Sequence, residues 1–204
     1  ANQSKINAIK NNNNNRFLRE EDIQDAIDEI LIGREKRERI LSKKEKTRVA
    51  YHEAGHCFMG YILNHCEQPI KVSIIPRGEA ALGFSQQKPS NDKLIVENQV
   101  ISKISVLLGG RSAEKVFFEN VSSGAYDDIE KISLLIKNYS EYWGMNKNIG
   151  PINIKILENL GSELSDELNN NTINIIQNIE SQTISILNEN KNYVKKIAEK
   201  ITCK

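Results

Sequence analysis

The 204-residue sequence has few cysteines and no marked excess of either charge. Its formal net charge is +1, with acidic and basic residues interspersed, so we expect no surface for nucleic acid or anionic lipid. The three cysteines, Cys57, Cys66 and Cys203, form no CxxC pair and no even set. This pattern indicates a reducing compartment and argues against a structural zinc knuckle.

Long apolar runs are also missing. No stretch approaches the roughly 20 residues of a membrane-spanning helix, and the first residues, ANQSKINAIK, lack the apolar centre of a signal peptide. There is no GxxxxGK[ST] phosphate-binding loop, so we expect this chain neither to bind nor to hydrolyse ATP. The length fits one domain, or one domain plus a fragment. We therefore expect a soluble chain, alone or as the soluble part of a larger protein.

Hydrophobic periodicity predicts a mostly helical fold. The segment at 18–36 has an apolar stripe of Ile23, Ile27, Ile30 and Leu31, and Gly33 suits the end of its helix. A second helix is expected to begin at the capping-box pattern SKKE, residues 42–45, and to run to about Asn64. The asparagine runs at 11–15 and 169–171 are interpreted as loops.

Two short strands are expected after the second helix. Alternating apolar residues at 70–74 and 82–86 flank the turn signal Pro76-Arg77-Gly78. More helices are expected over about 91–119, 127–142 and, as a pair, 160–204. The predicted fold class is therefore mainly α, with a small β-hairpin next to the helix at 47–64.

That helix contains the segment TRVAYHEAGHCFMGYILNH, residues 47–65, with all three histidines of the chain. His52 and His56 lie one turn apart on one helix face, so both imidazoles can reach a single ion, and Glu53 lies beside them. Zinc hydrolysis needs this arrangement: two neutral nitrogen ligands, an open coordination position and a carboxylate that takes a proton from water. We predict zinc on His52 and His56, with Glu53 as the catalytic base.

A chance occurrence of HExxH is the alternative, because the pentapeptide alone is only moderately specific. The flanking positions are apolar or small, so the helix should be buried on most sides. Imidazoles and a carboxylate without partners would be costly there. Gly55 inside the helix costs about 1 kcal/mol relative to alanine, and it suits a neighbouring backbone that passes close to the site.

A third protein ligand is required, and His65 does not supply it. It lies nine residues after His56, on the opposite face of the helix. The position ten residues after His52 is Ile62, so the histidine pattern of the metzincins is absent.

Carboxylates are the main remaining candidates. Glu114 lies in a predicted helix, and Asp127 and Asp128 lie in the first turn of another. A thiolate fits less well, because Cys57 points away from the histidine face and Cys66 lies past the helix end. The spacing alone does not choose among the three carboxylates.

Five blocks occur in order over about residues 47–154: AYHEAGHCFMGYILNHCEQPIKVSIIPRG, ALGFSQ, LLGGRSAEKVFF, SSGAYDDIEK and WGMNKNIGPI. Together they resemble the peptidase domain of FtsH-type membrane-anchored AAA proteases. Three segments are most similar in sequence to the mitochondrial, matrix-facing m-AAA branch: NHCEQPIKVSIIPRG, GAYDDI and GMNKNIG. Residues 1–33 resemble the last helices of the AAA lid, which makes 34–46 a charged linker and 47–204 the zinc metallopeptidase domain, with C-terminal helices at about 160–204.

The resemblance implies a choice of third ligand. The family uses the aspartate of a T-G-A-x-x-D pattern, which falls on Asp128, with Ser123 in place of the threonine. Glu114 matches a family glutamate, and we expect it to orient a histidine. In the alternative, the chain is an HExxH peptidase of another family with Glu114 as third ligand.

The strand pair is expected to bind substrate. An edge strand beside a zinc site can receive an extended peptide as an added strand, held by main-chain hydrogen bonds. We expect this edge in AALGFS, residues 80–85, at Leu82, Gly83 and Phe84, with Gly83 permitting close approach. A purely structural hairpin is the alternative.

The resemblance further implies a zinc endopeptidase domain with one Zn²⁺ per chain, which degrades unfolded and membrane proteins. ATP and Mg²⁺ would act only through the AAA module. The expected partners are like chains in a homo- or hetero-hexamer, and no nucleic acid. A membrane tether in the full-length protein would place it at an organellar inner membrane. Similarity to the m-AAA branch favours the mitochondrial inner membrane, with a plastid or bacterial membrane as the alternative. A catalytically inactive oligomerisation scaffold is the rival function.

Overall fold

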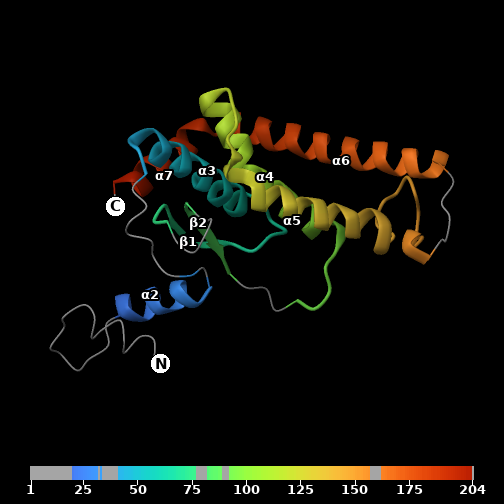
Figure 1. Ribbon diagram of the computed structural model, residues 1–204, viewed down its shortest axis with the longest axis horizontal. Helices are drawn as coiled ribbons and strands as arrows, with labels where there is room; N and C mark the ends of the chain where they lie inside the picture. The colour runs from blue at the N-terminus through green and yellow to red at the C-terminus, as the bar shows by residue number, and fades with distance from the viewer. Residues whose placement is uncertain are drawn as a thin grey trace.

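The computed structural model describes residues 20–31, 33, 41–76, 82–88, 92–156 and 162–203. These residues are mostly helical and include a two-stranded antiparallel sheet, which confirms the predicted fold class (Figure 1). No helix in the described ranges is long and apolar enough to cross a membrane. The elements are α2 (Glu20–Leu31), α3 (Lys43–Ile62), β1 (Pro69–Ser73), β2 (Phe84–Gln87), α4 (Glu97–Phe118), η1 (Ser123–Ala125), α5 (Tyr126–Lys137), η2 (Asn138–Tyr142), η3 (Ile154–Ile156), α6 (Ser162–Glu189) and α7 (Lys191–Thr202).

Helix α3, which carries the HExxH segment, begins at the predicted capping box. The backbone N–H of Glu45 donates to Ser42 Oγ at 3.2 Å, and the backbone N–H of Ser42 donates to Glu45 Oε2 at 2.9 Å. These bonds satisfy amide groups that the first helical turn would otherwise leave unpaired. The first turn of α3 therefore includes 43–46, the last part of the expected linker.

Helices α3 and α4 cross where each has a glycine. A Cβ atom at Gly55 would collide with the carbonyl oxygen of Gly109 and lie 2.8 Å from Cβ of Ala113. A Cβ atom at Gly109 would lie 2.8 Å from the carbonyl oxygen of Gly55. Only glycine permits this approach of two backbones. The close passage expected from Gly55 is thus present, and α4 runs unbroken through Gly109 and Gly110.

Two apolar cores meet on α4, which packs against α3, α5 and α6 (Figure 1). The first core joins α3, α4, α6 and α7, and the second joins α4, α5, η2 and α6. The asparagine run at 169–171 lies inside α6, so its assignment to a loop was wrong. Asparagine costs a helix only about 0.7 kcal/mol per residue or less, which packing of the apolar face outweighs. The fully or nearly buried residues of the two cores include Ala50, Ala54, Met59, Leu187 and Val194 in the first, and Val100, Ile104, Leu108, Ile132 and Ile179 in the second.

The hairpin of β1 and β2 packs against α3. Val72 pairs with Ser85 and Ser73 with Phe84, and the register is irregular between Pro69 and Lys71. Strand β2 begins at Phe84, later than the expected segment 80–85. Leu82 and Gly83 precede it, and residues 77–81 lie outside the described ranges.

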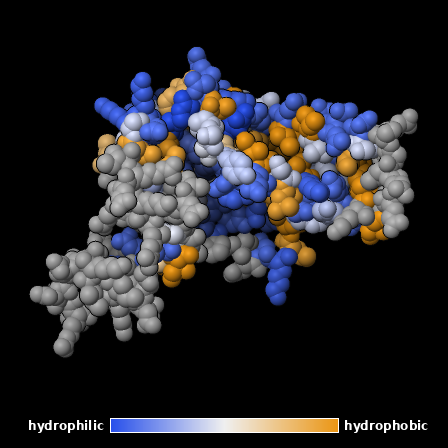
Figure 2. Space-filling view, in the orientation of Figure 1, coloured by the Kyte–Doolittle hydropathy of each residue, from blue (hydrophilic) through white to orange (hydrophobic). Residues whose placement is uncertain are grey.

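Helix α2 forms as expected, and Gly33 ends it. The N–H of Gly33 donates to the carbonyl of Glu29 at 3.2 Å, and its φ of 106° favours glycine. The apolar stripe, however, faces outward. Asp28 is buried in an ion pair with Lys71 of β1 at 2.6 Å, so a polar face of α2 meets the hairpin. The exposed stripe contributes apolar surface at the end of α2 in Figure 2 and contains Ile23, Ile27 and Ile30.

Candidate metal centre

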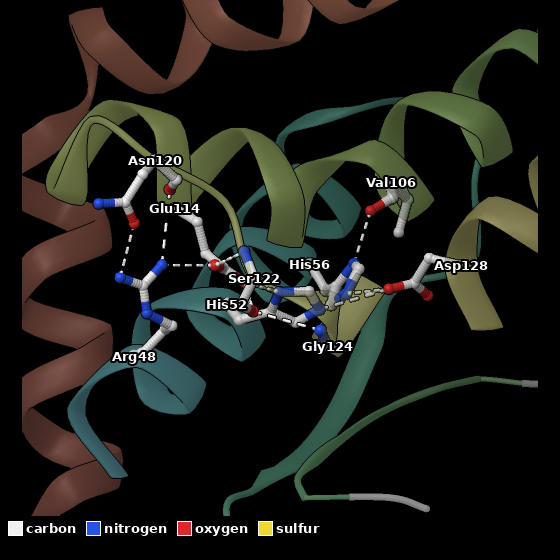
Figure 3. Close-up of polar contacts among 9 residues, drawn as sticks. All are labelled: Arg48, His52, His56, Val106, Glu114, Asn120, Ser122, Gly124 and Asp128. Atoms are coloured by element: carbon white, nitrogen blue, oxygen red, sulfur yellow. Dashed lines mark hydrogen bonds and ion pairs between the residues drawn. The ribbon is translucent and has the colours of Figure 1, made fainter. Parts of the chain in front are cut away.

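Side chains from two helices converge beside the α3–α4 crossing. His52 and His56 come from α3, and Asp128 comes from the first turn of α5. Oδ2 of Asp128 lies 3.3 Å from Nε2 of His52 and 3.2 Å from Nε2 of His56. One ligand atom from each residue lies within 4.8 Å of the others, and the three groups point toward one another in Figure 3. Two nitrogens and one oxygen are thereby available to a single ion.

The turn before α5 places Asp128. Ser122 caps η1, because its Oγ accepts the backbone N–H of Gly124 at 3.2 Å. Ala125 is buried at the junction of η1 and α5. Asp127, the neighbouring candidate, is exposed and does not join the cluster with the histidines.

Each histidine is held by its other ring nitrogen. Glu114 Oε1 lies 2.8 Å from Nδ1 of His52, and the carbonyl oxygen of Val106 lies 2.8 Å from Nδ1 of His56. A carboxylate and a carbonyl can only accept, so Nδ1 carries the proton in both rings. Each Nε2 then faces Asp128, and in the neutral ring its lone pair can bind a metal.

Glu114 is buried and binds more than His52. Its Oε1 also accepts the hydroxyl of Ser122 at 2.9 Å, and its Oε2 accepts the backbone N–H of Ser122 at 2.8 Å. Arg48 donates to Oε2 at 2.8 Å and reaches Asn120 Oδ1 at 2.7 Å (Figure 3). One carboxylate thus ties the His52 ring to the turn that leads to Asp128.

The residues around the cluster fit a metal ion in size and chemistry. A Cβ atom at Gly110 would lie 2.5 Å from Nε2 of both His52 and His56. Glycine at this position of α4 leaves open the space in front of both nitrogens. Two imidazoles and a carboxylate form a ligand set typical of catalytic zinc, which keeps one position free for water or substrate.

Glu53 lies next to the cluster without being part of it. Its side chain is buried, and no residue that the structure describes forms a hydrogen bond or ion pair with its carboxylate. Gly83, just before β2, makes room for it, because a Cβ atom there would lie 2.8 Å from Glu53 Oε1 and 2.9 Å from the carbonyl oxygen of Ser73. The absence of a side chain at Gly83 thus leaves room for the Glu53 carboxylate.

The electrostatics of the cluster favour a bound cation. Burial alone would lower the pKa of His52, but contacts with Asp128 and Glu114 outweigh it and raise this pKa to about 9. For Asp128, burial raises the pKa, whereas the contacts with His52 and His56 outweigh burial and leave the pKa well below its usual range. Burial also raises the pKa of Glu53, although the charges of His56 and His52 oppose this. A raised pKa makes the Glu53 carboxylate a stronger base, as a proton acceptor in catalysis requires.

A cavity of about 340 Å³ opens beside His52 and Glu53. Leu82, one of the expected substrate residues, lines it together with Val49, Tyr126 and Asp127. Phe84 lies in β2 as expected, whereas Leu82 precedes the strand.

Four contributors to the centre were missed by sequence reasoning. They are Arg48, Ser122, Gly110 and the carbonyl of Val106. Arg48 lies one helical turn before His52, so its helical spacing could have suggested it. Gly110 belongs to the pair Gly109-Gly110, and a glycine pair does not by itself indicate a place in a metal centre. A backbone carbonyl such as that of Val106 has no sequence signature.

Comparison with known proteins agrees with this geometry. The model of peptidase family M41 matches residues 39–204. ATP-dependent zinc metalloprotease FtsH 3 of Petrotoga mobilis is 34% identical over 201 residues, covering 92% of this chain and 31% of the relative. ATP-dependent zinc metalloprotease FTSH 8, mitochondrial, of Oryza sativa subsp. japonica is 35% identical over 184 residues, covering 86% and 22%.

A third relative, FtsH of Syntrophobacter fumaroxidans, is 42% identical over 132 residues, covering 64% of this chain and 20% of that protein. The chain thus spans about a third or less of the length of these relatives. The matches include bacterial and mitochondrial proteins and extend over nearly the whole described structure. The chain belongs to peptidase family M41 and is an FtsH-type peptidase domain.

Proposed function

We propose that this chain is the proteolytic part of an ATP-dependent zinc metalloprotease and hydrolyses peptide bonds in unfolded and membrane proteins. The observation that carries the proposal is the convergence of Nε2 of His52, Nε2 of His56 and Oδ2 of Asp128 next to Glu53. The names of the relatives, each an ATP-dependent zinc metalloprotease, support it.

In the proposed mechanism, His52, His56 and Asp128 hold the zinc ion. When bound, zinc supplies a Lewis acid that polarises water and the peptide carbonyl. Glu53 accepts the proton of the attacking water and later donates it to the leaving amine. Glu114 and the Val106 carbonyl keep both Nδ1 atoms protonated and both rings oriented.

The substrate is proposed to lie along the hairpin as an added strand. The β1–β2 sheet has two strands in the described part of the chain, so each strand has one edge without a sheet partner. Phe84 begins β2, and Leu82 lines the cavity beside Glu53. An extended peptide at this edge would be held by backbone bonds and would tolerate many sequences.

The remaining parts of the proposal concern the whole protein. Residues 1–33 would end an AAA lid, 34–46 would form a linker and 47–204 the peptidase domain. Because the relatives are about three times longer or more and are named as ATP-dependent, an AAA module would accompany this chain. We propose a hexamer of like chains, tethered to an inner membrane. The mitochondrial relatives from rice support a mitochondrial location.

Zinc analysis combined with cleavage of a chemically unfolded protein tests the function. The wild-type chain should hold about one zinc and cleave the substrate. Glu53→Gln should keep the zinc and lose cleavage by about 100-fold or more, the usual contribution of a positioned general base. Glu130→Gln makes the same charge change at an exposed position of α5 and should leave both unchanged.

Two results would count against this function. A chain that binds no zinc would not be a metallopeptidase. A zinc-loaded chain that cleaves no faster than Glu53→Gln would instead be the inactive oligomerisation scaffold.

A further inference from the structure

A second cavity, of about 440 Å³, lies on the His56 side of the metal centre. Three lysines from three elements line it: Lys88 directly after β2, Lys103 of α4 and Lys131 of α5. We call this cavity the lysine pocket. The apolar part of its lining consists of Val106, Leu107, Leu134 and Leu135.

The lysine pocket is continuous with the metal centre. Val106 lines the pocket, and its carbonyl oxygen accepts the Nδ1 proton of His56 at 2.8 Å. Lys131 follows Asp128 by three residues on α5, so both side chains lie on the same face of that helix. The charge of Lys131 is also one of those that act on the Glu53 carboxylate. A molecule bound at the metal centre would therefore lie close to this pocket.

Positive charge in the pocket is in excess. Glu67 is its acidic lining residue, and an ion pair at 2.9 Å joins it to Lys103. Within the described ranges, Lys88 and Lys131 form no ion pair. Two ammonium groups without an ion pair, together with an apolar lining, suit a ligand that has both a carboxylate and methylene groups.

Strand β2 connects the two cavities. Leu82, directly before the strand, lines the cavity beside Glu53, and Gln87 and Lys88 at its other end line the lysine pocket. An extended peptide advances about 3.3 Å per residue, so a few residues of substrate along β2 would span the distance. The first cavity differs in charge, since Glu45 and Asp127 are among its lining residues.

We propose that the lysine pocket binds an acidic side chain, preferably glutamate, of the polypeptide being cleaved. The domain would then select peptide bonds that have a glutamate or aspartate a short distance away on the His56 side. This inference rests on the proposed peptidase function. Binding of the substrate backbone alone would tolerate many sequences, and the lysine pocket would add a preference for an acidic residue.

Capped peptides test the preference. Each peptide carries an acetylated N-terminus and an amidated C-terminus, so that its side chain is the one carboxylate available. A single glutamate, or glutamine as the matched residue, is moved along either side of the cleaved bond, and kcat/KM is measured with the zinc-loaded chain. We expect glutamate to be favoured about two- to fivefold at one position or at alternate positions, as for an exposed ion pair.

Variants of the pocket identify the residues responsible. Lys131→Gln and Lys88→Gln should each abolish the preference, measured as the ratio of kcat/KM for the glutamate peptide to kcat/KM for the glutamine peptide. Lys131→Glu should reverse it, so that a lysine peptide is cleaved faster than the glutamate peptide. Lys137→Gln removes a lysine from the same helix but outside the pocket and should change nothing. Raising the salt to about 1 M, where the Debye length is about 3 Å, should also erase the preference.

Each failure has a separate meaning. If the wild-type chain cleaves none of the peptides, the proposed function fails. If it cleaves glutamate and glutamine peptides equally, or if Lys131→Gln and Lys88→Gln retain the preference, cleavage stands and the lysine pocket is not a substrate site.

Discussion

The Glu114 carboxylate lies 2.8 Å from Nδ1 of His52, on the side of the ring away from Asp128. With zinc on both Nε2 atoms as proposed, Glu114 would orient His52 and would not contact the ion. Glu114→Gln keeps an acceptor for Nδ1 but removes the charge, so zinc affinity should fall about 10- to 100-fold. Asp128→Asn removes an anionic ligand and should weaken zinc binding more. Competition with a chromogenic chelator gives both dissociation constants.

The variant that loses more zinc affinity identifies which of the two carboxylates is the third ligand. A Glu114→Gln variant that loses zinc as completely as Asp128→Asn would make Glu114 a ligand and support the alternative HExxH family. Glu130→Gln serves as the control, since Glu130 is exposed on α5 and lies outside the cluster.

Arg48 should act on zinc through Glu114. Its guanidinium donates to Glu114 at 2.8 Å and to Asn120 at 2.7 Å, and stacks 4.7 Å from the ring centre of Phe118. Arg48→Gln should weaken zinc binding, though less than Glu114→Gln does. The double variant should be less affected than the two single losses combined, because contacting residues typically couple by about 0.5–3 kcal/mol. Strictly additive losses would show that Arg48 acts independently of the carboxylate.

Local signals made the HExxH helix predictable. The capping box, the helical spacing of His52 and His56, and Gly55 are all features of neighbouring residues in one helix. Asp128 lies 76 positions after His52, and residue reasoning alone left it level with Glu114 and Asp127. The positions of α4 and α5 relative to α3 separate these carboxylates, and a single sequence does not contain that information. The family pattern supplied it.

Other differences have the same physical origin. The stripe of α2 was found, yet periodicity does not say which element covers it, and the Asp28–Lys71 ion pair turns another face to the hairpin. The asparagine run in α6 was misread because composition was weighed without the long apolar face that holds the helix. At Gly83, sequence indicated a close approach but not that Glu53 makes it.

Alanine at Gly55 should destabilise the fold. The added methyl would collide with the backbone oxygen of Gly109, and neither helix backbone can yield easily. Overpacking of this kind costs about 1–3 kcal/mol of unfolding free energy. Gly60→Ala, in the same helix, would meet its nearest neighbour, Pro69 Cδ, at an ordinary 3.5 Å. It should be neutral or stabilising by up to about 1 kcal/mol.

Urea unfolding of the two glycine variants, without zinc, measures this difference. Equal stability of Gly55→Ala and Gly60→Ala would mean that the α3–α4 crossing can widen freely. The glycine contact would then not fix the distance between the two helices.

Alanine at Gly110 should weaken metal binding without destabilising the fold. Its methyl would lie 2.5 Å from Nε2 of His52 and of His56, so the two rings must turn away from the ligand position. Ring ends can move more easily than backbone, and alanine favours the helix by about 1 kcal/mol. We therefore expect Gly110→Ala to keep its helical circular dichroism and its metal-free stability. Zinc affinity should fall about 100-fold or more, because ligand geometry tolerates displacements of only about 0.5 Å.

Gly60→Ala is the control for Gly110→Ala, since it makes the same change in α3 at a position where the added Cβ meets Pro69, Gln87 and Glu67 and no histidine. It should bind zinc like the wild type. If Gly110→Ala also binds zinc normally, the ion cannot occupy the space between the two Nε2 atoms and Gly110, and the assignment of the metal position would be wrong. If it loses zinc while remaining folded, the open space that glycine leaves on α4 is as necessary to the centre as the ligands on α3 and α5.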